Sequence, residues 1–356
     1  MNDPIVRFDD VDIVFGDRPK TALPLVDQGK TRAEIQAETG QVLGVAHCSL
    51  KIHEGEIVVL MGLSGSGKST LLRAVNGLNP VVRGRAEVRM GDGSWADPHA
   101  VSRARLRKLR QERVAMVFQQ FGLLPWRTVR DNVAFGMEIA GVPKAERHTR
   151  VDEQIALVGL DGWAERRVHE LSGGMQQRVG LARAFATQAS ILLMDEPFSA
   201  LDPLIREKLQ DDLLELQERL RRTIVFVSHD LDEALKLGNR IAIMEGGRIV
   251  QMGTAREIVT APATDYVREF VGSVDRAAVL TAGDAMTPRA TAPGATAPDA
   301  TEGALHGDGA RSVDFDLPLR EAMAALSDAE RLEVTRSGQA VGTLTAGDVM
   351  RALSAS

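Results

Sequence analysis

The chain has 356 residues, of which 44% are hydrophobic and 26% charged, and its formal net charge is −6. This length suggests two domains, and the negative balance argues against a dedicated nucleic-acid binder, which usually carries a basic face for phosphates. No apolar run approaches the roughly 18 residues of a membrane span, and the start "MNDPIVRFDD" is unlike a basic signal region. The single cysteine, Cys48, can form no internal disulfide, so we expect a globular protein of a reducing cytoplasm.

Two strands with a helical insertion between them are predicted for the first part of the chain. The strand-like segment "DIVFG" ends at Asp17, and alternating apolar residues resume in "GVAHCSLKI". Between them, near residues 17–44, Thr31 and Glu34 have capping-box spacing and Gly40 can end a helix. A buried strand in "EGEIVVLMG" and a helical pattern in "STLLRAVNGL" follow, which together predict a strand–loop–helix unit.

The middle of the chain predicts a mostly parallel sheet accompanied by helices. "SILLMDEP" and "TIVFVSHD" are apolar runs bounded by polar residues, as expected of fully buried strands. "PLIREKLQDDLLELQERLRR", between them, places leucines at helical spacing, and charged amphipathic stretches near 99–180 predict a helical subdomain. The fold class indicated is α/β.

The composition changes after about Asp275. The stretch near 287–312 is dominated by Ala, Thr, Pro and Gly and has almost nothing to bury, so it is predicted to be a flexible linker. "DLPLREAMAAL" and "VGTLTAGDVMRAL" then predict a helix, a short strand and a helix. We expect a large domain over 1–275 and a small C-terminal region over 276–356.

The stretch between the buried strand and the helix carries a phosphate-binding motif. "GLSGSGKST" satisfies G-x-x-x-x-G-K-[ST], in which glycines let backbone N–H groups surround phosphates at the positive end of a helix. Lys68 would reach the β- and γ-phosphates, and the Ser69 hydroxyl would ligate Mg²⁺. The loop residues predicted to hold the nucleotide are Gly62, Leu63, Ser64, Gly65, Ser66, Gly67, Lys68, Ser69 and Thr70.

An acidic pair ends the predicted strand "ILLMDEP". Asp195 can hold Mg²⁺, directly or through water, and Glu196 can accept a proton from an attacking water. Such a pair at a strand end is commonly only a helix cap. Together with the phosphate loop, it fits hydrolysis of a nucleoside triphosphate.

The segment "LSGGMQQR", Leu171–Arg178, resembles the signature of ATP-binding cassette (ABC) proteins, and the resemblance extends from about residue 5 to 260. It implies a P-loop NTPase fold with a mixed sheet core and a helical subdomain. In that family two cassettes enclose two ATP molecules, so a homodimer is expected. The signature of one copy contacts the γ-phosphate bound by the other, again at a helix N-terminus. The residues assigned to this nucleotide contact are Ser172, Gly173, Gly174 and Gln177.

Four further positions match the family pattern one by one. Gln119 in "VFQQFGLLPW" resembles the glutamine that senses Mg²⁺ and the attacking water, with Gln120 as the alternative. Asp202 in "SALD" resembles the aspartate at the cassette–cassette contact, and His229 in "VFVSHD" matches the histidine that binds the γ-phosphate. Phe15 replaces the usual tyrosine that stacks on adenine. The resemblance thus implies Glu196, His229, Gln119 and Lys68 as catalytic residues, and Ser69, Gln119 and Asp195 as metal ligands.

The insertion "ALPLVDQGKTRAEIQAETG" resembles importers of quaternary-amine osmoprotectants such as glycine betaine, proline betaine and choline. "FGLLPWRTV" favours the choline-type members. The resemblance implies integral-membrane permease subunits as partners, on the cytoplasmic face of the inner membrane, and indirectly a periplasmic or lipid-anchored substrate-binding protein. The ATPase subunit of another amino-acid or small-solute importer remains the alternative.

Two other classes compete with the transport interpretation. A cassette acting on nucleic acid or translation would normally carry two cassettes in one chain or a long coiled coil, and this sequence shows neither. A GTPase would carry an N-K-x-D motif, which is absent, and would leave "LSGG" unexplained.

The C-terminal segments "AVLTAGDAMTP", "DLPLREAMAAL" and "QAVGTLTAGDVMRAL" resemble pieces of a cystathionine-β-synthase-type (CBS) regulatory module. The resemblance implies a small α+β module that senses ionic strength or a nucleotide. There is room for about one such module, so its apolar face would pair with that of a second copy. The alternative is a degenerate, partly disordered tail without a ligand.

Overall fold

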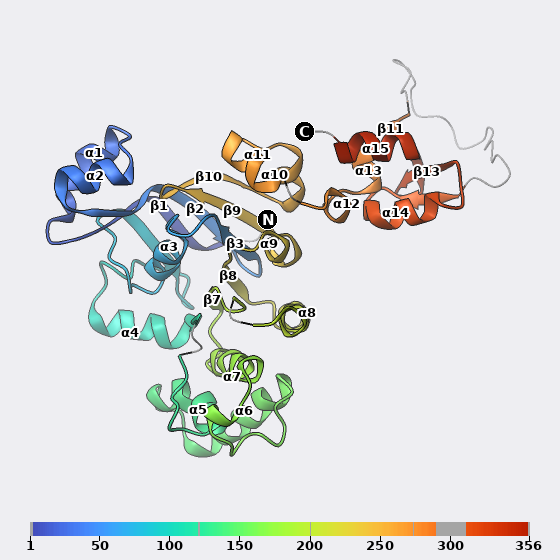
Figure 1. Ribbon diagram of the computed structural model, residues 1–356. Coiled ribbons are helices and arrows are strands. Elements are labelled where there is room, and N and C mark those ends of the chain that lie inside the picture. Colours follow the sequence, from blue (N-terminus) through green and yellow to red (C-terminus); the bar gives the residue numbers. More distant parts are fainter. Residues whose placement is uncertain (1–2, 120–121, 200, 273, 290–310, 355–356) are drawn as a thin grey trace. The chain divides into compact units, whose positions relative to one another are not determined.

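The computed structural model describes residues 3–119, 122–199, 201–272, 274–289 and 311–354 (Figure 1). Gln120 and most of the predicted linker lie outside these residues. The chain divides into two compact units, the first formed by residues 1–258 and 262–267, the second by 259–261 and 268–356. The sequence-based boundary lay at 275, whereas this division falls between residues 258 and 268; each unit is described by itself.

An antiparallel sheet in the order β2-β1-β4-β5 opens the first unit. β1 is longer than the predicted strand because the apolar alternation already begins at Ile5. The strands are β1 (Pro4–Phe15), β2 (Val42–His53), β4 (Arg83–Arg89) and β5 (Trp95–Ala96).

The predicted insertion between β1 and β2 is helical. It consists of the 3-10 helix η1 (Pro19–Ala22) and the helices α1 (Leu23–Asp27) and α2 (Arg32–Thr39). The predicted capping box is present, since Thr31 accepts a hydrogen bond from the Glu34 backbone and Glu34 accepts one in return from the Thr31 N–H at 2.8 Å. Gly40 ends α2 with a positive φ of 68°. A small core fixes the insertion to the sheet and contains Val14, Ala22, Val26, Ile35, Leu43 and Ala46.

A six-stranded sheet in the order β10-β9-β3-β8-β7-β6 forms the centre of the first unit. It is parallel except for the antiparallel β9–β10 pair. Every residue of β3, β7 and β8 is buried, which explains why their sequences are apolar runs without alternation. The strands are β3 (Ile57–Met61), β6 (Val114–Val117), β7 (Ile191–Asp195), β8 (Thr223–Val227), β9 (Arg240–Glu245) and β10 (Arg248–Gly253).

The predicted helical subdomain near 99–180 contains one strand, because β6 joins the edge of the central sheet. Its four residues are too few to show a strand period, which is why sequence alone missed it. Three of the helices of this region, α5, α6 and α7, pack on one another (Figure 1). The helices of the first unit beyond the insertion are α3 (Lys68–Ala74), α4 (Arg103–Glu112), α5 (Val129–Ile139), α6 (Lys144–Leu157), η2 (Val168–Glu170), α7 (Gly173–Ala186), α8 (Pro203–Leu220), α9 (Leu231–Leu237) and α10 (Ala255–Thr260).

The second unit is a four-stranded sheet in the order β11-β14-β13-β12 with short helices. The predicted helix, strand and helix are α14, β14 and α15; β13, with the alternating pattern "RLEVTR", was not predicted. Its elements, with α11 leading into it, are α11 (Asp265–Val271), α12 (Arg276–Val279), α13 (Ala282–Ala285), β11 (Thr287–Pro288), β12 (Ser312–Asp314), α14 (Leu319–Leu326), β13 (Arg331–Arg336), β14 (Gln339–Thr345) and α15 (Ala346–Ser354).

Among the described helices of both units, none combines the length and the apolar character needed to span a bilayer.

Candidate functional site

The phosphate loop lies between β3 and α3 and has a backbone that requires glycine at two positions. Gly62 has a φ of 142°, and a Cβ there would lie 2.2 Å from the Met244 carbonyl oxygen. Gly67 caps α3 with a φ of 107°, and a Cβ there would lie 2.5 Å from the Gly44 oxygen. Any larger residue at either position would therefore force the loop apart.

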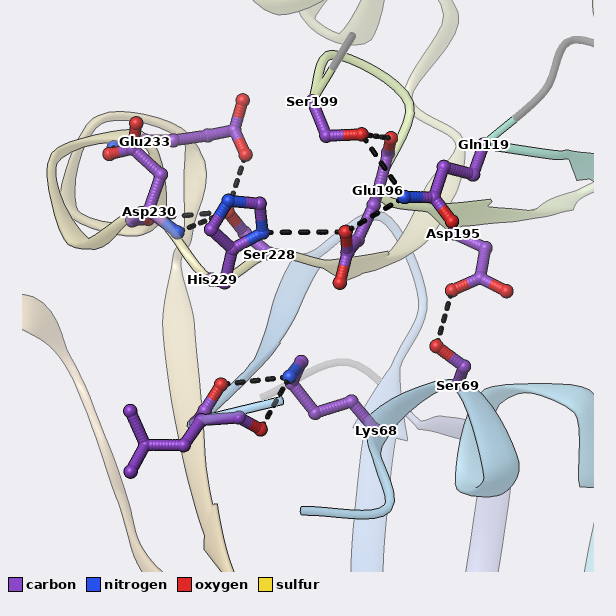
Figure 2. Close-up of polar contacts among 12 residues, drawn as sticks. Lys68, Ser69, Gln119, Asp195, Glu196, Ser199, Ser228, His229, Asp230 and Glu233 are labelled. Carbon is purple, nitrogen blue, oxygen red and sulfur yellow. Dashed lines mark hydrogen bonds and ion pairs between the residues drawn. The ribbon is translucent and has the colours of Figure 1, made fainter. Parts of the chain in front are cut away.

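Lys68 is folded back onto this loop (Figure 2). Its Nζ donates to the carbonyl oxygens of Gly62 at 2.8 Å and Leu63 at 3.0 Å, and the residue is only 4% exposed. Burial lowers the pKa of the ammonium group, against the opposing effect of the Glu196 and Asp195 carboxylates. A buried cation that donates to two neutral carbonyls is poised for an anionic ligand, since phosphate oxygens are stronger acceptors.

Asp195, at the end of β7, joins the loop to the central sheet. The Ser69 hydroxyl donates to its Oδ1 at 2.6 Å (Figure 2). Arg73 donates to its Oδ2 from Nε at 3.1 Å and from Nη2 at 2.7 Å. The hydroxyl and the carboxylate are oxygen ligands of the kind that Mg²⁺ prefers. Ser69 and Asp195 therefore fit a magnesium site, whereas Gln119, the third predicted ligand, contacts Glu196 instead.

Two polar side chains converge on the Glu196 carboxylate, and a third, Ser199, contacts the Glu196 backbone (Figure 2). Its Oε2 lies 3.2 Å from Gln119 Nε2 and 3.3 Å from His229 Nδ1. Ser199 accepts from the same Gln119 amide at 3.4 Å and donates to the Glu196 backbone oxygen at 3.0 Å. Glu196 itself has a φ of 46°, which is unusual for a side-chain-bearing residue. The sequence predicted the first three residues of this group but not Ser199.

The segment that carries His229 is held by a buried polar network. Ser228 donates to Glu233 at 2.5 Å, and Gln210 donates to the same carboxylate at 3.0 Å. Burial raises the pKa of Glu233, against the opposing effect of these two hydrogen bonds. No motif pointed to Glu233, because a glutamate in the first turn of a helix is an ordinary capping residue.

A cavity of about 290 Å³ opens beside the loop, near the ~300 Å³ lower limit of small-molecule pockets. Glu196 reaches it from β7, and Phe15, the residue predicted to stack on adenine, lines it from β1. Arg32 of the insertion also lines it and was not predicted. The remaining lining residues are Val42, Leu43, Gly44, Ser64, Gly65, Gly67, Lys68, Ser69 and Thr70.

The signature residues lie on a different surface of the first unit. Ser172 and Gly173 are exposed at the start of α7, where the Ser172 hydroxyl accepts from the Met175 N–H at 3.4 Å. Asp202 caps α8 in the same way, accepting from the Ile205 N–H at 3.0 Å. None of the described residues that line the loop cavity comes from these two helices.

Gln177 corrects one sequence-based expectation. The residue was grouped with the nucleotide contacts, yet it is 0% exposed. It follows the Ser172 cap by five positions, so α7 has turned it toward the interior by then. In this arrangement Gln177 cannot touch a nucleotide.

Comparison with known proteins decides the family. An ABC transporter family model matches residues 45–199. The trimethylamine N-oxide transport system ATP-binding protein TmoW of Pelagibacter ubique is 44% identical, over 80% of this chain and 82% of that protein. The glycine betaine/carnitine transport ATP-binding protein GbuA of Listeria monocytogenes is 46% identical, over 79% of this chain and 70% of that protein. The chain belongs to the ABC transporter ATP-binding proteins.

A further relative and a solved structure each match about three quarters or less of this chain. The glycine betaine/proline betaine transport ATP-binding protein ProV of Escherichia coli is 52% identical over 76% of this chain. The match covers 66% of ProV, so the cassette spans about two thirds of that relative's length. Among solved structures, the dimeric bacterial ABC transporter cassette MJ0796 superposes with a TM-score of 0.58 at 29% identity, over 70% of this chain and 99% of that one.

Proposed function

We propose that this chain is the ATP-hydrolysing subunit of an importer for quaternary amines. The observation that carries the ATPase proposal is the Glu196 carboxylate, which lines the loop cavity together with Lys68 while Gln119 and His229 converge on its Oε2. A carboxylate held by two side chains at the edge of a phosphate cradle is suited to accept a proton from water. Glu196 is therefore our candidate general base.

The other residues of the site would bind and orient the nucleotide. Lys68 would exchange two carbonyl acceptors for phosphate oxygens. Ser69 and Asp195 would hold Mg²⁺, which supplies positive charge against the phosphate oxygens. Phe15, which lines the cavity, would contact the base. The polar network around Ser228 would keep His229 at the edge of the site.

The exposed signature supports an active form with two copies of the cassette. Ser172 and Gly173 are N-terminal groups of a 14-residue helix that stay apart from the cavity of their own chain. Free backbone N–H groups at a helix start favour an anion. We propose that they complete the nucleotide site of a second copy, as the dimeric solved relative also suggests.

The substrate class is inferred from the relatives. ProV, GbuA and TmoW are named for glycine betaine and proline betaine, for carnitine, and for trimethylamine N-oxide, all small molecules with a methylated amine centre. Relatives named for methionine import align over only 236 residues, against 271–286 for these three. We therefore favour a quaternary amine over another amino acid; the choline-type assignment stays a prediction.

An importer subunit of this kind requires partners. Membrane permease subunits would seat the cassette on the cytoplasmic face of the inner membrane, and a periplasmic or lipid-anchored protein would deliver the amine. Co-purification of the chain with a permease encoded beside it tests this part of the proposal.

Replacing Glu196 by glutamine tests the ATPase proposal. Because glutamine keeps the shape but loses the proton acceptor, Glu196→Gln should slow hydrolysis by about 10²–10⁴-fold while the ATP Kd changes little. Glu207→Gln, the same change at an exposed position of α8, serves as the control. Steady-state ATPase assays and equilibrium ATP titrations give the two readouts. Turnover of Glu196→Gln close to that of the unmodified chain would remove Glu196 as the base.

A further inference from the structure

Arg32, the first residue of α2, reaches from the insertion to the outer side of the phosphate loop. Its Nη1 donates to the Gly65 oxygen, and its Nη2 donates to the Gly44 oxygen and, at 3.2 Å, to the Ser66 oxygen. Two of these three acceptors belong to the loop itself. The capping box of α2 fixes the backbone from which the side chain extends. A helix outside the central sheet thus contacts the phosphate cradle directly.

The guanidinium group occupies a slot built from glycines. A Cβ on Gly67 would lie 3.1 Å from Nη2, and a Cβ on Gly247, in the turn between β9 and β10, would lie 2.9 Å from it. The Gly247 N–H also donates to the Ser66 oxygen at 3.0 Å, next to the arginine. Glycine at both positions leaves room for a planar cation that any side chain would restrict.

The bonds of Arg32 act on peptide groups of the phosphate loop. The Ser66 carbonyl shares its peptide unit with the Gly67 N–H, whereas the Ser66 N–H, which shares its unit with the Gly65 carbonyl, donates to the Leu63 oxygen at 3.1 Å. A peptide N–H and C=O point in opposite directions, so a cation on the carbonyl side polarises the unit and makes the N–H a better donor, by perhaps 10–30% per bond. The guanidinium also keeps its charge when buried, which adds a positive charge next to Lys68.

We propose that Arg32 is a positioning residue of the nucleotide site, which holds the phosphate loop in its anion-binding form and adds positive charge to it. This rests on the proposed ATPase function. The insertion is then part of the nucleotide site, and the guanidinium acts on the phosphates more than on the base.

Full-length Arg32→Ala, Arg32→Gln and Arg32→Lys chains test this, with Lys30→Ala as the matched control. Lys30 is two residues away on the same insertion, forms a surface ion pair with Glu38, and makes none of the three bonds that Arg32 gives to the Gly44, Gly65 and Ser66 oxygens. The readouts are the Kd of ATP and of pyrophosphate, which lacks the base. Arg32→Ala should weaken both by about tenfold or more, since hydrogen bonds from a charged group are stronger than those between neutral groups. Arg32→Lys should show a smaller loss, and Lys30→Ala none.

Chemical rescue separates this role from simple attachment of the insertion. Guanidinium ion at about 10 mM, far below denaturing concentrations, should enter the vacated slot of Arg32→Ala and restore part of the pyrophosphate affinity, while leaving the Lys30→Ala chain unchanged. If Arg32→Ala does not fold, Arg32→Gln, which keeps amide donors without the charge, should still bind pyrophosphate more weakly. Unchanged Kd values in folded Arg32 variants would overturn the inference. Failure of the unmodified chain to bind ATP would instead overturn the proposed function.

Discussion

Each unit of the molecule contains a buried aspartate that accepts from both a hydroxyl and a guanidinium group, and these two aspartates differ in what they hold. Asp195, 3% exposed at the end of β7, accepts from the Ser69 hydroxyl and from Arg73. Asp348, 4% exposed in α15, accepts from the Thr345 hydroxyl and from Arg351. Burial and partner types are nearly the same in the two cases.

The backbone partners separate the two. Asp348 also accepts from the Thr345 N–H at 2.8 Å and from the Thr287 hydroxyl at 2.8 Å, so it ties the start of a helix to β11. Among the described residues, the Asp195 carboxylate accepts hydrogen bonds only from side chains. Asp348, which accepts from a backbone N–H of its own helix start, stabilises the fold. Asp195 accepts from side chains, which can move away and be exchanged for a ligand.

The largest expected effect lies at Asp195. Asp195→Asn should lower Mg²⁺-dependent ATP hydrolysis by about 100-fold or more, because the amide loses the charge that would hold the metal. Asp348→Asn, the same change in the second unit, should leave hydrolysis within about twofold. Steady-state ATPase assays over a range of Mg²⁺ concentrations measure both. Equal losses of hydrolysis in the two variants would contradict a metal-binding role that belongs to Asp195 and not to Asp348.

The next effect concerns the stability of the second unit. Asp348→Ala should destabilise this unit by about 1–3 kcal/mol, because the variant loses a helix cap and leaves the Thr287 hydroxyl without its acceptor. Asp328→Ala, which removes a surface ion pair with Arg311, should cost at most about 1 kcal/mol. Hydrogen exchange of peptides from 331–354 measures the difference. Equal protection in the two variants would contradict the structural role of Asp348.

The same aspartate fixes the sign of a pH dependence. Burial raises the pKa of Asp348, but hydrogen bonds from Thr345 and Thr287 outweigh it and hold the pKa below its usual value of 3.8. A lowered folded-state pKa means that the stabilisation is complete above the unfolded value and is lost as pH falls through the folded one. The stability difference between Asp348→Ala and the unmodified chain should therefore shrink below about pH 4.

The smallest expected effect is on basal hydrolysis when the second unit is removed. Deleting residues 276–356 should change the basal rate by no more than about twofold, since the site residues belong to the first unit. If the deleted segment is the regulatory module that its sequence resembles, ATPase activity of the assembled transporter should lose its response to salt or nucleotide. An unchanged response would leave the segment without a regulatory role.

Local patterns predicted the parts of the site that depend on neighbours in sequence. The phosphate loop, the capping box at Thr31 and the strand that ends in Asp195 each follow from residues within one short window, and the structure contains all three. Their mutual placement follows because β3, β7 and β8 are parallel and present their carboxyl ends at one edge.

Contacts between distant segments could not be predicted in this way. Arg32 lies 33 positions from Gly65, and no spacing rule links an arginine at a helix start to a loop carbonyl. The burial of Gln177 depends on which face of α7 packs inward, and polar residues on both sides of it hide that face. Ser199 could not be predicted as part of the site, because its contact with Gln119 joins two segments that are 80 positions apart in the sequence.

The positive φ of Glu196 has a thermodynamic consequence. A residue with a side chain in the left-handed region costs the fold about 1–2 kcal/mol of stability, a cost that glycine would not have. The conformation persists because the Glu196 N–H donates to the Val227 oxygen at 3.1 Å and the Glu196 oxygen accepts from Ser199. Selection for stability alone would drift toward glycine here and remove the carboxylate. With Glu196 as the proposed general base, the cassette gives up folding free energy for chemistry at this residue, and we expect stabilising screens that ignore turnover to enrich inactive chains substituted at Glu196.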